Sequence, residues 1–343
     1  MTGKERIFAV LEGKVPDRVP FSPNIGQWFD YHKAKNTLPE ELSDCETEWE
    51  AMTALGCDIF SRRLCSPIRM VAAPYEETQQ TLQPGWTRTT LTSPLGCLTS
   101  ITRFDEESWT IFTVEHFIKD PDRDLAVLLW ITEHSEWAFD QQGWEQATEK
   151  MGDEGVLIVP FFQSPIKFLH NWAGQELATF LLLDKEKECE ELFEVFREKV
   201  FQVAQQALRS SAKVFCLMDN LDSLFHTPVL VRRYAATFYG DLADFFHSQQ
   251  RYLFSHADGR LKALIPLIRD IGLDGFEGIP HPPIGDLNLD EAKNLHEGFV
   301  VVGGITAHES EATGPDAKDF IFRYCRDLFS KMRPFDRFVF STG

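Results

Sequence analysis

The chain has 343 residues, of which 43% are hydrophobic, and a formal net charge of −19 at pH 7. Such a composition can bury a sizeable core, which excludes disordered and fibrous proteins, and it fits one large domain or two small ones. No stretch approaches the roughly 18 uncharged apolar residues that a membrane-spanning helix needs. The start, MTGKERIFAVLEGK, is charged and amphipathic, unlike a signal peptide, so we expect a cytoplasmic protein. The acidic balance, without a basic cluster, disfavours nucleic acid as a partner.

The N-terminal part predicts, in chain order, a helix over 3–12, a strand over 19–25, a helix over 46–55 and a strand over 57–63. Residues 75–118 then break this pattern with threonine-rich alternating runs separated by Pro-Gly and Pro-Leu-Gly turns. Alternation of this kind indicates a small antiparallel hairpin insertion. Two roles are open for this insertion: a rim over a site, or a structural flap without ligand contacts.

From residue 155 onward, short apolar runs alternate with longer amphipathic segments. The apolar runs predict strands over 156–162, 213–219, 252–256, 275–279, 299–306 and 337–343. The amphipathic segments predict helices over 186–210, 229–249, 260–271, 289–297 and 315–332. Repeated strand–helix units imply right-handed crossovers and a parallel sheet, either doubly wound or closed into a barrel. About eight strands without a G-x-G-x-x-G turn favour an eight-fold β/α (TIM) barrel, with residues 1–343 as one catalytic domain.

The seven cysteines are widely scattered and include no Cys-x-x-Cys pair. An odd number of separated thiols favours reduced, packed cysteines over disulfides or a zinc ribbon. Cys216 lies within a predicted strand, so we expect it to be a core thiol.

Polar residues gather where the predicted strands end, which is where β/α barrels carry their chemistry. They are Asn24, Gln163, Asp219, Asn220, His256, Glu277, Thr306 and His308. A catalytic zinc needs about three protein ligands plus an open position, and His256 and Glu277 offer an imidazole and a carboxylate from consecutive strands. His256 can equally be a barrel histidine satisfied by its neighbours.

Two aspartates have competing interpretations. Asp258 precedes Gly259 and a predicted helix, so an N-cap role competes with metal binding. Asp219 follows a buried strand, where a carboxylate needs a partner or water, and it fits either a substrate contact or the start of a polar loop.

Aromatic side chains also lie near the predicted strand ends. They are Trp28, Phe29, Phe161, Phe162, Phe168 and Trp172, in a chain with 29 phenylalanines. Aromatic faces bury an aryl ring well, so they agree with an aromatic substrate. Each ring taken alone is more often part of a core.

Four segments together carry a resemblance to a known family. They are RIFAVLEGKVPDRVPF (6–21), the strand that ends at Asp219, H-x-D-G at 256–259, and GLDGFEGIPHPPIGDLNLDEAK followed by VVVGGI. Over essentially the whole chain they resemble the uroporphyrinogen decarboxylase-like superfamily. That superfamily includes the decarboxylases, corrinoid-dependent methyltransferases and, more distantly, the zinc domain of cobalamin-independent methionine synthase. The resemblance implies an eight-fold β/α barrel.

The resemblance favours the methyltransferase branch. The decarboxylases carry an arginine-rich segment after the first strand, which holds the carboxylates of the porphyrinogen. This chain has SPNIGQWFDYHKAK there, with no arginine between Arg18 and Arg62. A polyanionic substrate would lack guanidinium partners.

The zinc methyltransferases carry His-x-Cys at the sixth strand, in some members a Glu about two dozen residues later, and a Gly-Cys pair after the last strand. Here the matching positions hold His256, Asp258 in place of the cysteine, and Glu277. The final strand reads FVFSTG, so the resemblance leaves open whether a further ligand follows Gly343.

A His/Glu site makes zinc a harder Lewis acid than thiolates do, which suits an oxygen leaving group. The resemblance therefore implies an O-demethylase methyltransferase. Zn²⁺ would polarise a methyl ether, best that of a methoxylated aromatic, and cob(I)alamin would accept the methyl group. Its metal ligands would be His256, Glu277 and Asp258, and its catalytic residues Asp219, Asn220 and His256. Its substrate contacts would be Asn24, Trp28, Phe161, Gln163 and Trp172.

The corrinoid (cobalamin) is too large for a filled barrel, so we expect it on a separate corrinoid-binding protein that docks over the carboxyl face. Residues 75–118 would form a rim of that face. One alternative is a lyase that acts on a small carboxylic acid without metal, with Asp219 and His256 as proton handlers. Another is a barrel that only docks onto a corrinoid protein.

Overall fold

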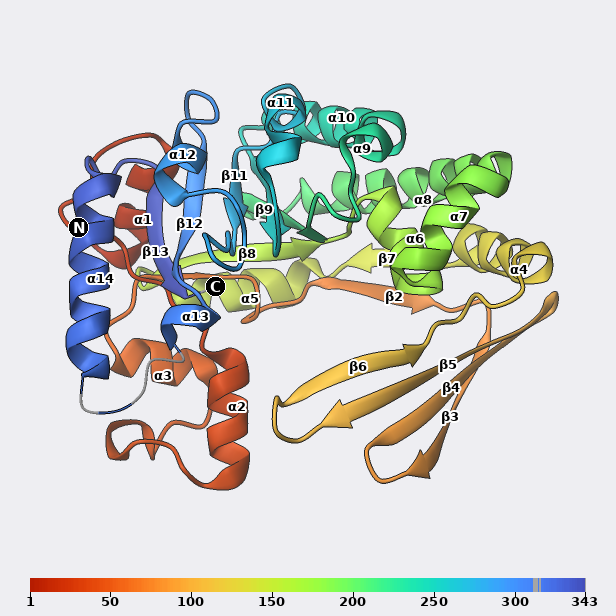
Figure 1. Cartoon of the computed structure of the whole chain (residues 1–343), viewed down its shortest axis with the longest axis horizontal. Helices are drawn as coiled ribbons and strands as arrows, with labels where there is room; N and C mark the ends of the chain where they lie inside the picture. Colours follow the sequence, from red (N-terminus) through yellow and green to blue (C-terminus); the bar gives the residue numbers. More distant parts are fainter. Residues whose placement is uncertain (311–313, 315, 343) are drawn as a thin grey trace. The chain divides into compact units, whose positions relative to one another are not determined.

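The computed structural model describes residues 1–310, 314 and 316–342. Its main sheet has seven parallel strands in the order β1-β8-β9-β10-β11-β12-β13 (Figure 1). They are β1 (Ile59–Ser61), β8 (Gly155–Phe161), β9 (Val214–Leu221), β10 (Tyr252–Ala257), β11 (Gly275–Glu277), β12 (Val300–Ile305) and β13 (Phe338–Thr342). Near-continuous apolar runs form them because both faces of a parallel sheet are covered. The predicted α/β class with a parallel sheet is confirmed.

The predicted closed eight-stranded barrel is not what the described residues form. The strand expected over 19–25 is reduced to a single parallel bridge between Phe21 and Phe340. Pro20 and Pro23 have no backbone N–H, so they cannot donate to a strand ladder. The segment still makes single hydrogen bonds on both sides: Ser22 N donates to Phe340 O at 2.8 Å, and Phe21 O accepts from Asp58 N at 2.8 Å.

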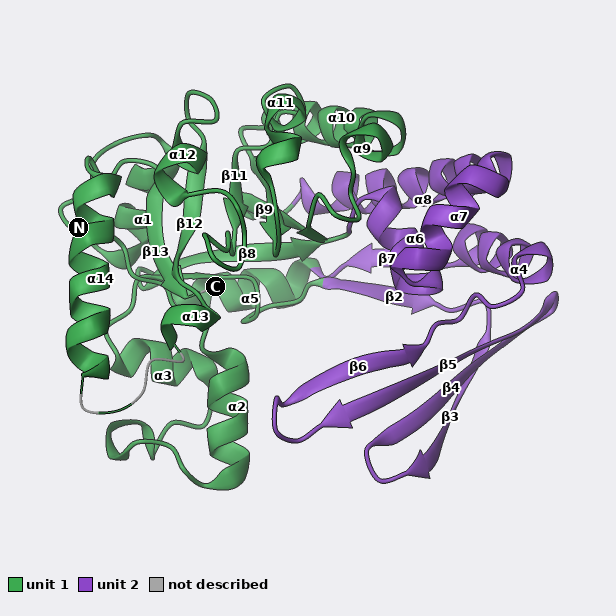
Figure 2. Ribbon diagram, viewed as in Figure 1, with its two compact units in different colours: residues 1–67, 141–162, 210–343 green, residues 68–140, 163–209 purple. Residues whose placement is uncertain are grey.

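Contacts divide the chain into two compact units (Figure 2). Unit 1 comprises residues 1–67, 141–162 and 210–343, and unit 2 comprises residues 68–140 and 163–209. The main sheet belongs to unit 1. The single catalytic domain expected over 1–343 stays a prediction.

The helices of unit 1 agree with the predicted ones in part. They are α1 (Gly3–Leu11), α2 (Gly26–Lys35), η1 (Glu40–Leu42), α3 (Glu48–Ala54), α5 (Gln141–Met151), α9 (Pro228–Tyr234), α10 (Ala236–His247), η2 (Lys262–Leu264), α11 (Ile265–Ile268), α12 (Leu289–Lys293), α13 (Ala307–Ser310) and α14 (Ala317–Met332). Of these, α2, η1, α5 and α13 were not predicted, and the helix expected over 289–297 ends at Lys293. The helix expected over 229–249 is split into α9 and α10. The one expected over 260–271 shortens to η2 and α11, because Pro266 fits only the first turn of a helix. Residue 315, where the last predicted helix would begin, is outside the described residues.

The core of the main sheet is closed at its amino-terminal end by α1. Ile7 and Val10 of this helix are buried in one cluster with Val156, Val214 and Val300, which stand near the starts of their strands. Cys216 lies in the same cluster, so its thiol is part of the core as expected. Chemistry is therefore left to the opposite, carboxyl-terminal end of the strands.

The segment 75–118 forms more than the small hairpin expected from its sequence. Unit 2 contains a four-stranded antiparallel sheet of β3 (Glu76–Gln83), β4 (Trp86–Ser93), β5 (Gly96–Asp105) and β6 (Thr110–Glu115). It also contains the antiparallel pair β2 (Ile68–Ala72) and β7 (Glu136–Phe139) and the helices α4 (Pro121–His134), α6 (Pro165–Ala173), α7 (Gln175–Asp184) and α8 (Glu186–Ala207).

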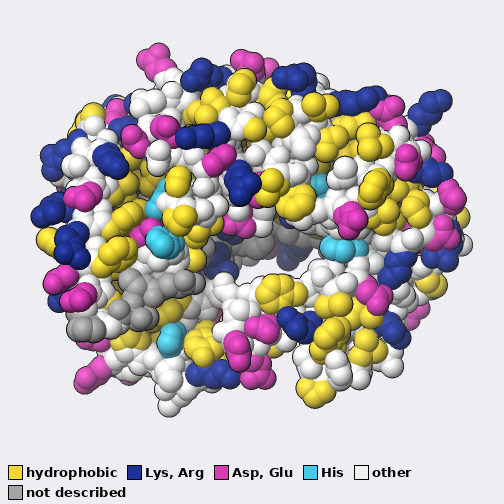
Figure 3. Space-filling view, in the orientation of Figure 1, with side chains coloured by type: hydrophobic (Ala, Val, Ile, Leu, Met, Phe, Trp, Pro, Cys, Tyr) yellow, Lys and Arg dark blue, Asp and Glu magenta, His cyan; other side chains and the backbone are white. Residues whose placement is uncertain are grey.

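The seven cysteines are all free thiols, in agreement with their scattered spacing. Among the residues that the structure describes, no helix has the length and apolar character to cross a membrane. On the face drawn in Figure 3, acidic and basic side chains are interspersed with hydrophobic ones.

The N-terminal segment 6–21 is tied to β1 by buried charges. Asp58, which is 2% exposed, forms ion pairs with Arg6 and with Arg18, the latter at 2.6 Å between Nη1 and Oδ2. Arg6 also pairs with Asp17, with 2.7 Å between Nε and Oδ1. A buried carboxylate with two guanidinium partners fixes where the chain enters the sheet.

We predict that Asp58→Ala lowers the free energy of unfolding by about 3 kcal/mol, because it removes the buried carboxylate that pairs with the buried Arg6 guanidinium. Urea denaturation measures this change. As a control, Glu12→Ala removes the exposed ion pair with Lys14 and should cost less than about 1 kcal/mol. Equal losses in the two variants would contradict the structural role given to Asp58.

Candidate functional site

Two of the predicted site residues meet at the carboxyl ends of neighbouring strands. His256 of β10 is in register with Glu277 of β11. The imidazole Nδ1 lies 2.5 Å from Glu277 Oε2 and 3.1 Å from the backbone oxygen of the same residue. Because a carboxylate only accepts hydrogen bonds, Nδ1 carries a proton and donates it to Glu277. The ring is thereby oriented with Nε2 facing away from the carboxylate.

Arg62, which sequence reasoning passed over, completes the group. It follows β1 directly, and its Nε donates to Glu277 Oε2 at 2.9 Å. The side chains of Arg62, Glu277 and His256 are only 16%, 11% and 15% exposed. We call these three residues the charged cluster. A clue was available, since Arg62 leaves a predicted strand just as His256 and Glu277 do.

The charged cluster keeps Glu277 ionised despite its burial. Burial alone would raise the pKa of this carboxyl, but His256 and Arg62 outweigh burial and lower the pKa to about 2. On Arg62, burial lowers the guanidinium pKa, but the charge of Glu277, its hydrogen bond, and the nearby Cys216 and Asp258 together outweigh burial and raise the pKa. A carboxylate that accepts hydrogen bonds from a guanidinium and an imidazole is an arrangement that compensates a buried charge.

Gly278 makes room for the imidazole. Its φ of +82° is a left-handed conformation, and a Cβ at this position would lie 2.6 Å from His256 Cε1. Glycine adopts this backbone conformation without strain, and without a Cβ it leaves room for the imidazole ring of His256. The backbone after β11 is therefore shaped around the histidine ring.

Asp258 and Asn220 contact each other and form no hydrogen bond to the three residues of the charged cluster within the described structure. Asn220 Nδ2 donates to Asp258 Oδ2 at 3.4 Å, and both residues are exposed. Asp258 does not cap the following helix either, because Asp286 accepts from the backbone N–H of Leu261 and Lys262 at 2.7 and 3.1 Å.

The donor set does not fit a catalytic zinc. Within the described part of the chain, no group of three or more His, Cys, Asp or Glu side chains could hold a metal ion. His256 and Glu277 supply two donors, and Glu277 Oε2 already accepts from both His256 and Arg62. A ligand at or after Gly343 lies outside the described residues. Zinc at His256, Glu277 and Asp258 therefore stays a prediction.

Asp219 is placed on the other face of the sheet from His256. Its carboxylate is fully buried and accepts from Tyr239 of α10 at 2.8 Å and from Ser255 at 2.9 Å. Ser255 and His256 are consecutive in β10, so their side chains point to opposite faces. The structure does not bring Asp219 and His256 together.

The expected substrate contacts are spread over different surroundings. Asn24 lies at the end of β13, where its backbone N–H donates to Thr342 Oγ1 at 2.8 Å. Trp28 is 39% exposed. Phe161 is buried and packs its ring 5.5 Å from Phe246 of α10, so it belongs to the core.

The last two expected contacts belong to unit 2. Trp172 of α6 packs 5.0 Å from the ring of Phe117. Gln163 follows β8 in sequence and is half-buried.

A second polar network follows β12. Glu309 of α13 is buried and accepts from Thr306 Oγ1 at 2.7 Å, and its Oε2 lies 3.3 Å from His281 Nε2. The same His281 nitrogen is 2.7 Å from the hydroxyl of Tyr324. Of the residues in this network, the sequence pointed only to Thr306. His308, which was also expected at this strand end, lies exposed on α13. Each polar group has a partner, so the network explains how the β11–β12 connection is held.

Ionisation of Glu277 predicts a dependence of stability on pH. Because the folded pKa is lowered to about 2 from the usual 4.5, this carboxylate stabilises the fold above pH 4.5, and the contribution is lost as the pH falls toward 2. Between pH 5 and pH 3, wild-type protein should lose more unfolding free energy than Glu277→Gln, measured by urea denaturation. Glu198→Gln, a change of an exposed carboxylate on α8, should follow the wild-type slope. Identical slopes in wild type and Glu277→Gln would contradict the ionised state of Glu277.

Comparison with known proteins supports the fold. No protein-family description matches the chain, and no curated protein matches it in sequence. Among solved structures, it is similar to a methyltransferase from Methanosarcina mazei, with a TM-score of 0.60 and 14% sequence identity. The likeness covers 100% of this chain and 93% of the other. At this identity the likeness shows the fold alone.

Proposed function

We propose that the protein is a methyltransferase that takes the methyl group of a methyl ether, best that of a methoxylated aromatic, and passes it to the cob(I)alamin of a separate corrinoid protein. The observation that carries the proposal is the charged cluster at the carboxyl ends of β1, β10 and β11. The resemblance of the sequence to corrinoid-dependent methyltransferases and the fold likeness to a methyltransferase support the same assignment.

Cleavage of a methyl ether leaves the electron pair of the carbon–oxygen bond on oxygen. Preorganised hydrogen-bond donors and positive charge that meet this oxygen lower the barrier. Arg62 supplies a permanent positive charge, and of its five N–H groups only Nε donates to another described residue. His256 Nε2 likewise makes no hydrogen bond in the described structure, since its recorded contacts all run through Nδ1. Arg62 therefore has donors left for a substrate oxygen, and the proposal requires His256 to be protonated on both nitrogens, so that Nε2 is a second donor.

Glu277 gives these donors their positions. It binds Arg62 Nε and His256 Nδ1 through one oxygen, Oε2, so a single carboxylate holds both side chains in place. In the proposed reaction, Arg62 and the Nε2–H of His256 hold the ether oxygen while its bond to the methyl carbon breaks. The corrinoid, when its carrier protein is docked, supplies the nucleophile that takes the methyl group. The oxygen leaves as a phenolate that is hydrogen-bonded by both residues.

The alternative of a metal-free lyase has less support. It requires Asp219 and His256 to handle protons at one substrate, and these side chains lie on opposite faces of the sheet with Asp219 bound to Tyr239 and Ser255.

An anaerobic assay with free cob(I)alamin tests the proposal. Methoxybenzoates, methanol and methylamines are offered, while the cobalamin spectrum and the demethylated products are followed. We expect turnover with methoxybenzoates, and rates lowered about 100-fold by Arg62→Met and by His256→Gln, because each change removes one donor to the leaving oxygen. Arg326→Met and His134→Gln, both at exposed positions, serve as controls with wild-type rates. Carbon dioxide release from small acids without methyl transfer would favour the lyase instead.

Removal of metal ions distinguishes catalysis by the charged cluster alone from catalysis that needs a zinc ion. Because the described donors do not fit zinc, we expect a chelator to leave the rate of demethylation unchanged and purified protein to contain less than one zinc per chain. A rate that falls with the chelator and returns with Zn²⁺, but not in His256→Gln, would show that the predicted zinc is real.

A further inference from the structure

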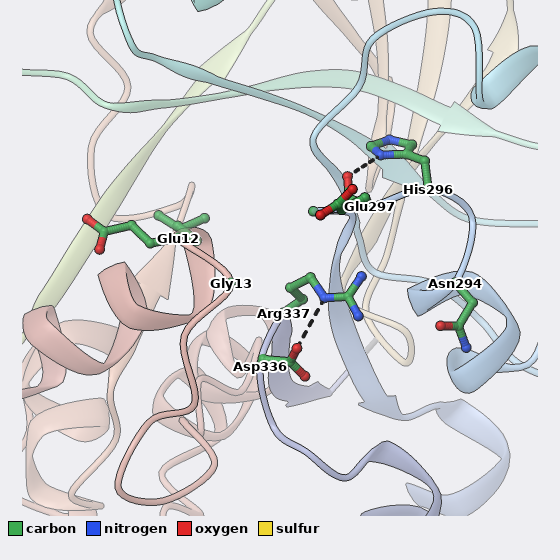
Figure 4. A pocket seen from close by; sticks show the side chains of 9 residues that line it. Glu12, Gly13, Asn294, His296, Glu297, Asp336 and Arg337 are labelled. Atoms are coloured by element: carbon green, nitrogen blue, oxygen red, sulfur yellow. Dashed lines mark hydrogen bonds and ion pairs between the residues drawn. The ribbon is translucent and has the colours of Figure 1, made fainter.

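Two hollows lie near the amino-terminal ends of the strands of unit 1. The larger, of about 630 Å³, is lined by polar residues that include Glu12, Glu297, Asp336 and Arg337 (Figure 4). Asp336 in this hollow already pairs with Arg337 at 3.5 Å and with Lys293 at 2.7 Å. Nothing in this hollow calls for a ligand.

The smaller hollow has a different character. It has a volume of about 290 Å³ and lies between α1, α5 and the start of β8. Its walls are mostly apolar, with Phe8, Trp144, Met151, Val156 and Leu157 among them. We call it the Trp144 pocket. It lies at the starts of the strands, whereas the charged cluster lies where the strands end.

Two lysines line this apolar pocket without an acidic partner. Neither Lys4 nor Lys213 forms an ion pair within the described residues, although the chain carries 53 acidic and only 34 basic side chains. Lys213 is half-buried, and burial together with the nearby charge of Arg251 lowers the pKa of its ammonium. A cation beside an apolar wall is stabilised when an anion approaches it.

A hydroxyl in the same pocket also lacks a partner. Thr148 Oγ1 is buried and makes no hydrogen bond to any described residue. Buried polar atoms are nearly always hydrogen-bonded, so one that lines a pocket marks a place for a polar ligand atom. The pocket thus combines an aromatic wall, two cations and one free hydroxyl.

We infer that the Trp144 pocket is a binding site for a small aromatic carboxylate. The ring lies against the side chains of Phe8 and Trp144, and the carboxylate meets Lys4, Lys213 and the Thr148 hydroxyl. Aromatic walls favour a flat ring over an aliphatic chain, and ligand pockets typically combine such walls with a few polar groups. The inference does not depend on the proposed methyl transfer, because it concerns binding at the other end of the strands.

Isothermal titration calorimetry with 2-naphthoate tests the site, with the uncharged 2-naphthamide and with octanoate as comparison ligands. We expect saturable 1:1 binding of 2-naphthoate, and binding weakened about tenfold in Lys213→Met, which removes one charge from the pocket. Thr148→Phe fills the pocket and should abolish binding, with circular dichroism as a check of folding. Lys187→Met, at an exposed lysine on α8, is the matched control and should bind like wild type.

Three results would overturn the inference. They are the absence of saturable binding, equal binding of 2-naphthoate by wild type and Lys213→Met, and tighter binding of octanoate or 2-naphthamide than of 2-naphthoate. A second site at the charged cluster would be recognised because Arg62→Met, and not Lys213→Met, would weaken it. Loss of methyl transfer with intact 2-naphthoate binding would leave this inference standing and reject the proposed function alone.

Discussion

A carboxylate buried at the end of a parallel strand has to be compensated by positive charge, and in this protein Glu277 imposes that requirement. Its two partners come from far apart in the chain, Arg62 after β1 and His256 in β10. Removing either would leave a charge in a poorly solvated place, which is costly. The pairing therefore orders the carboxyl ends of three strands and fixes the positions of the Arg62 and His256 side chains.

The two ends of the main sheet have different roles. At the amino-terminal end, α1 covers the core, and Asp58 binds Arg6 and Arg18. The motif RIFAVLEGKVPDRVPF, which helped to identify the resemblance, is accounted for by this anchoring. At the carboxyl-terminal end, the charged residues are only partly covered and keep unused donors. Such a division between a stabilising and a reactive end is expected of β/α folds.

Strands and helices of the C-terminal half could be predicted from the sequence because parallel strands read as apolar runs. The segment 19–25 was misjudged because its prolines prevent a ladder, although its composition resembles a strand. Side-chain direction was the harder problem. Asp219 and Phe161 stand near strand ends as expected, but the alternation of the strand turns them toward α10. Only the register of the folded sheet decides that direction.

Long-range partners were equally hidden. Arg62 and Glu277 are separated by 215 positions, and no local pattern links them. The sequence brought His256 and Glu277 forward as metal ligands, because an imidazole and a carboxylate suit zinc. With Arg62 beside them, the same two groups form a network of charges and hydrogen bonds. In the proposed reaction, the guanidinium offers electrophilic help to a leaving oxygen.

The central claim is that Arg62 and His256 act as one unit held by Glu277, and a double-variant comparison tests it most directly. Rates of methoxybenzoate demethylation are measured for Arg62→Met, His256→Gln and the variant with both changes. Because residues that act as a unit are not additive, the account predicts that the double variant is about as slow as the slower single variant. Rate losses that multiply in the double variant would show two independent groups and would contradict the account.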